Sequence, residues 1–188
     1  MRALELIGRG LRAFRRDRRG VSAVEFALIA PVLILTYFGL AELSSAMMAQ
    51  RRARHSASAI GDLVAASTTV STSDLSDDFA AATTILSPFP TGTLKLRVTS
   101  ITGDSSATPK VDWSNAQGSG MSALAKASTV TGLPTGLITA AGDNVIMAES
   151  TYTYNSTFAF VLKNGLTFTE KFYLRPRQVS VVTCSNCP

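Results

Sequence analysis

The run from Phe26 to Ala49 constrains the fold of this chain more than any other feature, because its 24 residues include a single charged side chain, Glu42. As an α-helix the run would be about 36 Å long, enough to cross the ~30 Å hydrocarbon core of a bilayer with some tilt. Residues 1–20 precede it with seven Arg and two acids. Because basic residues tend to stay on the cytoplasmic side, we expect one membrane-spanning helix with a cytoplasmic N-terminus.

The excess charge of the chain lies in that N-terminal segment. The formal net charge is +5, whereas residues 21–188 carry eleven basic and eleven acidic side chains. A nucleic-acid-binding surface would need Lys and Arg gathered on a folded face. The distribution therefore argues against nucleic acid as a partner and favours a basic leader over residues 1–20.

Glu25 stands at the start of the apolar run and needs a cationic partner. A carboxylate inside a membrane segment costs ~2.5–3.5 kcal/mol on insertion scales. If the chain were cut after Gly20, the new amino group of Val21 would lie four residues from Glu25, and positions four apart share a helix face. The cut would thus create a partner for the acid.

Residues 15–35, RRDRRGVSAVEFALIAPVLIL, resemble the TadE-like pseudopilins, which are minor pilins of the tight-adherence (Tad) type IV pilus system. The shared features are the basic leader, the AVEFAL core and the proline that follows. The resemblance covers about residues 15–67, with weaker similarity at residues 110–114 and 174–177. It implies a prepilin peptidase site between Gly20 and Val21.

The resemblance also implies a non-enzymatic subunit that acts in pilus assembly, in priming or in tip adhesion. Its partners would be the prepilin peptidase, the major pilin, another minor pilin, the inner-membrane assembly platform and membrane lipid, with no cofactor. The chain would span the bacterial inner membrane once, with its C-terminal domain in the periplasm, or be incorporated into the extracellular pilus.

The alternative is a secreted or membrane-tethered periplasmic domain with a conventional signal peptide or anchor. Signal-peptide cleavage would then occur near Ser44-Ser45-Ala46 or Met48-Ala49. Glu25 within the apolar segment and a helix that continues beyond the run argue against this alternative. The mature N-terminus separates the two hypotheses.

Three further features of the anchor bear on its structure: a proline, a basic cluster and a second acid. Pro31 removes the helix hydrogen bond to the carbonyl of Ala27, so we expect a kink there. A basic cluster, RRARH, follows the run at residues 51–55. It is interpreted as a stop at the membrane interface, with acidic lipid or a partner carboxylate as the alternative ligand. Glu42 is expected near the outer interface, in solvent.

The spacing of apolar residues predicts that the helix continues past the membrane. Ala53, Ala57, Ile60 and Val64 recur at intervals of four, three and four, which gives one apolar stripe. Gly61 interrupts it at a cost of ~1 kcal/mol relative to Ala. We therefore expect a leader over residues 1–20, a transmembrane and spine helix over 21–69, and an α+β domain over 70–188.

The pattern within that domain predicts a short helix followed by several strands. The helix is expected from Asp74 to Leu86 with Ser73 as its cap. Alternation of apolar and polar residues, with turn signals between, predicts an antiparallel sheet packed against the emerging helix. The expected strands are Leu94–Val98, Val111–Trp113, Asn144–Tyr154, Phe158–Leu162, Leu166–Tyr173 and Arg177–Thr183, with a further short helix at Met121–Ala127.

The side chains show no catalytic or metal-binding pattern. The single His, His55, stands at the membrane exit, and the acids lack metal-ligand spacing. Cys184 and Cys187 have the spacing of a redox motif, but Pro188 follows, so no helix is expected to lower a thiol pKa. Two cysteines also fall short of a four-ligand zinc site. A structural disulfide between them is expected, with pairing to another subunit's cysteine as the alternative.

Overall fold

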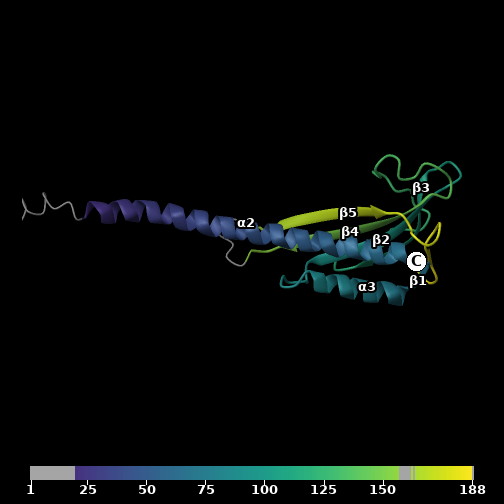
Figure 1. Ribbon diagram of the computed structural model, residues 1–188, viewed down its shortest axis with the longest axis horizontal. Helices are drawn as coiled ribbons and strands as arrows, with labels where there is room; N and C mark the ends of the chain where they lie inside the picture. The colour runs from purple at the N-terminus through teal and green to yellow at the C-terminus, as the bar shows by residue number, and fades with distance from the viewer. Residues whose placement is uncertain (1–19, 157–161, 163, 188) are drawn as a thin grey trace, which may run out of the picture. The chain divides into compact units, whose positions relative to one another are not determined.

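The computed structural model describes residues 20–156, 162 and 164–187 (Figure 1). The chain divides into two compact units, one ending at Leu43 and the other beginning at Ser44. One helix, α2 (Val21–Ala66), belongs to both. It is the one helix among the described residues that is long and apolar enough to cross a membrane. The expected basic leader lies outside the described residues, apart from Gly20.

The second unit is an α+β domain, as the sequence predicted. Its sheet is antiparallel with the strand order β3-β2-β4-β5. Two helices, the latter part of α2 and α3, lie side by side along it (Figure 1). The strands are β2 (Leu94–Gly103), β3 (Pro109–Gln117), β4 (Asn144–Tyr154) and β5 (Leu166–Leu174).

The predicted apolar stripe of α2 is confirmed, since Ala53, Ala57, Ile60 and Val64 are all buried. Gly61 lies on the same packed face. A Cβ at this position would stand 2.6 Å from Leu174 Cδ1 and 3.0 Å from Ala148 Cβ. The glycine that weakens the helix therefore allows α2 to approach the sheet closely.

Helix α3 (Thr72–Ile85) begins two residues earlier than predicted, and its cap is Ser71 rather than Ser73. Ser71 Oγ accepts from the Asp74 amide (3.2 Å), while the Ser71 amide donates to Asp74 Oδ2 (2.9 Å). This capping box satisfies two backbone donors at once. The helix buries Leu75, Phe79 and Ala82 against the core.

The predicted strand at Arg177–Thr183 is wrong. Only Thr183–Cys184 forms a strand, β6, which pairs in parallel with β1 (Thr69–Val70). The preceding residues are held by other bonds: the Arg177 amide donates to the Ala65 carbonyl (2.9 Å), and Trp113 Nε1 donates to the Val182 carbonyl (2.8 Å). Hydrogen bonds to the end of α2 and to the Trp113 side chain therefore take the place of pairing with a neighbouring strand.

Two other predicted elements were a short helix and a strand. Met121–Ala127 is not helical. Ala127 has a positive φ of 60°, and its amide donates a hydrogen bond to the carbonyl of Val111 in β3. Phe158–Leu162 falls outside the described residues except for Leu162, which is not in a strand.

Candidate membrane anchor and processing site

The bond between Gly20 and Val21 lies at the start of α2. Gly20 is exposed in a turn, and its carbonyl accepts a hydrogen bond from the Val24 amide (3.1 Å). Val21 is the first residue of the helix and is also exposed. The bond therefore precedes the regular helix, and no described side chain covers it.

Glu25 follows one turn later on α2 and is exposed. Because Val21 and Glu25 are four residues apart in one helix, they share a face. Pro31 also lies inside α2, and the helix continues on both sides of it. The structure thus places Gly20, Val21, Glu25 and Pro31 on one continuous element.

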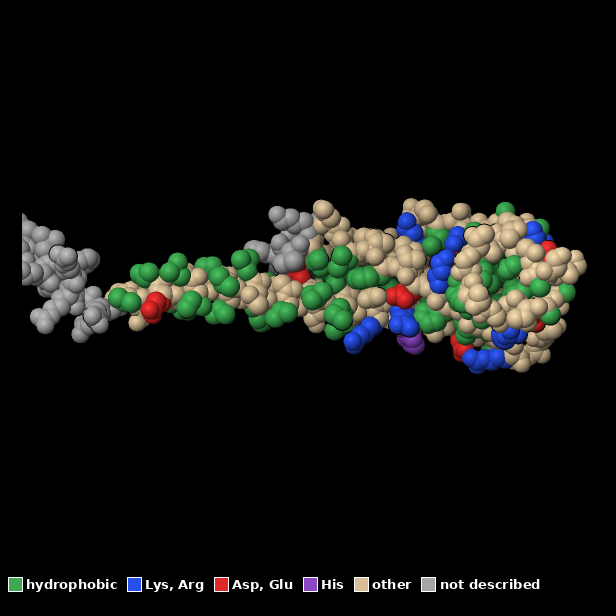
Figure 2. Space-filling view, turned by 90° about the horizontal axis from the view of Figure 1, so that it is seen from above, with side chains coloured by type: hydrophobic (Ala, Val, Ile, Leu, Met, Phe, Trp, Pro, Cys, Tyr) green, Lys and Arg blue, Asp and Glu red, His purple; other side chains and the backbone are tan. Residues whose placement is uncertain are grey.

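The first unit exposes many apolar side chains along its helix, and Figure 2 shows them on the visible face of the narrow part of the view. Four successive residues, Val32 to Leu35, are all exposed, and at about 100° per residue they cover most of the circumference. A helix that is apolar all round requires apolar surroundings, such as lipid. The 18-residue window that qualifies as a membrane span has none of its residues buried.

Glu42 departs from the expectation of a solvated acid, because it is only 3% exposed. A carboxylate removed from water requires a compensating interaction. Sequence reasoning placed this residue by depth alone. The position of a residue along the helix does not show whether other parts of the protein shield it from solvent.

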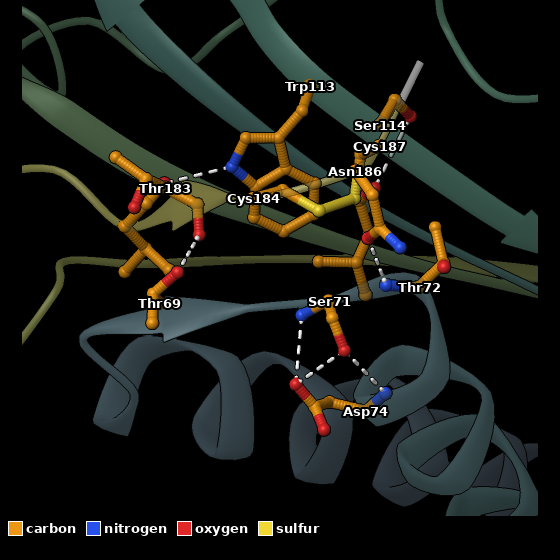
Figure 3. Close-up of a disulfide and its surroundings, with 12 residues drawn as sticks. Thr69, Ser71, Thr72, Asp74, Trp113, Ser114, Thr183, Cys184, Asn186 and Cys187 are labelled. Atoms are coloured by element: carbon orange, nitrogen blue, oxygen red, sulfur yellow. Dashed lines mark hydrogen bonds between the residues drawn. A yellow bond between two sulfur atoms is a disulfide. The ribbon is translucent and has the colours of Figure 1, made fainter.

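Cys184 and Cys187 are joined by a disulfide in a half-buried loop (Figure 3). Between them, Asn186 Oδ1 accepts from the Thr72 amide (2.8 Å) at the start of α3, and the Ser185 amide donates to the Val70 carbonyl (3.0 Å). The first amides of a helix have no partner within it. The loop therefore fixes the chain end to the start of α3, a role for Asn186 that the sequence analysis missed.

A buried ion-pair network on the sheet was also missed. The Glu149 side chain is 4% exposed and lies between Arg97 (2.5 Å) and Lys171 (2.9 Å). Burial alone would raise the pKa of Glu149, but the hydrogen bonds and charges of Arg97 and Lys171 outweigh it and hold the pKa below its usual value. The sequence did contain a signal for this network, because Arg97, Glu149 and Lys171 each lie within a predicted strand, on β2, β4 and β5.

This network does not form a catalytic site. Both oxygens of Glu149 are engaged by cations, so the carboxylate is a poor general base. Among the residues that the structure describes, no group of three His, Cys, Asp or Glu side chains could hold a metal ion.

The comparison with protein families agrees with the anchor described above. The family model described as "TadE-like protein" matches residues 20–61. The matched segment begins at Gly20 and ends within the part of α2 that packs on the sheet. No match was found among curated proteins or among solved structures. Residues 20–61 of this chain are therefore similar to the TadE-like protein family.

Proposed function

We propose that this chain is a minor pilin, or pseudopilin, of a Tad-type pilus. A prepilin peptidase cuts it after Gly20, its helix holds it in the bacterial inner membrane, and it then acts in pilus assembly, priming or tip adhesion. The folded unit from Ser44 onward lies in the periplasm or on the pilus. The major pilin, another minor pilin and the inner-membrane assembly platform are its partners.

The observation that carries this proposal is the coincidence of the family match with the start of α2. The matched segment begins at Gly20, and the helix begins at Val21. The exposed apolar surface that follows supports a membrane anchor. Proteins of this pilin-like family are generally non-enzymatic and structural, which fits the fixed carboxylate of Glu149.

The structure argues against a conventional signal peptide cut near residues 46–49. Ala46 and Ala49 are buried in the core of the second unit, and both lie within the uninterrupted helix α2. Cleavage there would also remove the first packed turns of the helix from the domain.

The mature N-terminus tests the proposal. The chain should be expressed with its assembly system, and its N-terminus and intact mass should be measured by mass spectrometry. We expect Val21 as the first residue, and we expect Gly20→Leu to remain full length. Gly10→Leu is the matched control, because it places the same side chain in the leader away from the bond, and it should be cut normally. A mature N-terminus near residue 47 or 50 would instead establish the secreted alternative.

A further inference from the structure

The four basic side chains of residues 51–55 separate into an inner and an outer group. Arg52 is partly buried and donates from Nη1 to the carbonyl of Ile85 (3.2 Å), at the C-terminal end of α3. That end carries partial negative charge, so a cation there stabilises the helix. Arg51, Arg54 and His55 are exposed, and we call these three residues the outer basic patch.

Within the described residues, no ion pair neutralises the charge of the outer basic patch. The four ion pairs within the described part of the chain involve Arg97, Lys171, Arg175 and Arg177, and none involves the patch. Arg54 lies over the ring of Phe172, 5.5 Å from its centroid, which leaves its charge in place. Glu170, whose Oε1 accepts a hydrogen bond from Gln50 Nε2 (2.9 Å), forms none of these ion pairs either.

An exposed apolar surface adjoins the patch on the same helix. Met47 and Met48 are about half exposed although they belong to the folded second unit. Figure 2 shows the single His beside basic side chains on the flank of the helix. The order along α2 is therefore exposed methionine, then exposed arginine and histidine.

The spacing of this boundary matches the layers of a bilayer. Arg51 and Arg54 follow Met48 by three and six residues, or about 4.5 and 9 Å along the helix axis. The polar headgroup layer on each side of a bilayer is about 5–7 Å thick. Methionine at the edge of the acyl chains would place Arg51 within the headgroup layer and Arg54 just beyond it, from where its long side chain can reach back to the lipid phosphates.

We propose that the outer basic patch binds the phosphate headgroups of anionic phospholipids in the outer leaflet of the inner membrane. This inference rests on the proposed membrane anchoring and goes beyond it, because it assigns a lipid class to named side chains. Binding would hold the subunit in the membrane until the patch is drawn out of the headgroup layer. Charge complementarity favours anionic over zwitterionic lipid.

The test uses the full chain in phosphatidylcholine vesicles, with spin-labelled phosphatidylglycerol or phosphatidylcholine as the probe. Flotation and carbonate extraction first establish that the chain is inserted. Electron paramagnetic resonance then gives the relative association constants of the two labelled lipids. A basic residue near an anionic lipid surface contributes up to about a fivefold preference. We expect Arg51→Gln to lower the preference for phosphatidylglycerol by up to that factor, and Arg51→Gln/Arg54→Gln to lower it further.

Lys126→Gln and Lys126→Gln/Arg175→Gln are the matched controls, because they remove one and two exposed positive charges elsewhere in the second unit. They should leave the preference unchanged, and Arg51→Lys should retain it. The charges of the leader are the same in every variant, so they do not affect the comparison between variants. Circular dichroism identifies any variant that fails to fold, and Arg51→Gln removes no side-chain hydrogen bond or ion pair found among the described residues.

Each outcome has a distinct meaning. A chain that does not insert refutes the membrane proposal itself. An inserted chain with no phosphatidylglycerol preference, or patch variants that keep it, refutes the lipid inference alone. Patch variants that keep the lipid preference but lose recovery of pilin partners in a pull-down would also refute it, and would assign the patch to a protein carboxylate.

Discussion

Replacing Gly61 with alanine tests whether close helix–sheet contact determines the stability of the folded unit. Alanine would gain ~1 kcal/mol in helix propensity. Its Cβ, however, would lie 2.6 Å from Leu174 Cδ1 and 3.0 Å from Ala148 Cβ. The Leu174 side chain can rotate away. The Cβ of Ala148, however, is bonded directly to the backbone of β4 and cannot, so α2 itself must move. Overpacking costs ~1–3 kcal/mol, and we expect a net loss of up to about 2 kcal/mol.

The single tryptophan provides the assay. Trp113 is 3% exposed and lies in the second unit, so its fluorescence during urea denaturation of the full chain in detergent reports the unfolding of that unit. Gly92→Ala is the control, since a Cβ at Gly92 meets nothing within 4 Å. Ala148→Gly should recover part of the loss in the double variant. A Gly61→Ala chain that is more stable than the wild type, by the full propensity gain, would refute the packing argument.

Three further predictions concern charge and covalent structure. Glu25→Ala should be cut and inserted but should recover fewer pilin partners in a pull-down, because the Val21 amino group would lack its carboxylate; recovery at the wild-type level would exclude charge pairing. Glu149→Gln should lower the free energy of unfolding by ~1–3 kcal/mol. The pKa of Glu149 is lower in the folded state than in the unfolded state. The ionised side chain therefore stabilises the fold at pH values above its unfolded pKa of about 4.3, and this stabilisation is lost as the pH falls through the folded pKa. Urea midpoints measured from pH 7 to pH 3 should thus fall less steeply in Glu149→Gln than in the wild type. Replacing Cys184 and Cys187 with Ser should leave processing intact and cost ~2 kcal/mol or less, since the loop is short; a double variant that assembles normally but loses a thiol-exchange activity would contradict a structural role.

The elements governed by local periodicity were predictable from the sequence. The stripe of α2 depends on side-chain spacing within one segment, and β4, which is buried along most of its length, has the predicted bounds, Asn144–Tyr154. The cap of α3 was displaced because Ser71 and Ser73 are both good caps. The reciprocal bond to Asp74, which requires a three-residue spacing, selects Ser71.

What escaped prediction depends on partners distant in the sequence. Apolar residues at Val179, Val181 and Val182 suggest a strand, yet the segment bonds to the end of α2 and to Trp113. Gly61 was read as a local weakness because its neighbours, Ala148 and Leu174, lie on strands far along the chain. The candidate processing site, by contrast, lies within one short segment, which is why sequence pattern alone could propose it.

The bonds at the C-terminal loop determine when this unit can finish folding. The contacts from Thr69 to Thr183 and from Thr72 to Asn186 each span 114 residues. Thr69, Val70 and Thr72, where α2 connects to α3, therefore bond to residues that are synthesised much later, at positions 183–186. Contacts so distant in sequence form slowly, because a long loop must close first. A chain truncated before Asn186 would leave the start of α3 without this acceptor, so the unit gains its full set of contacts only after residue 186 has been synthesised.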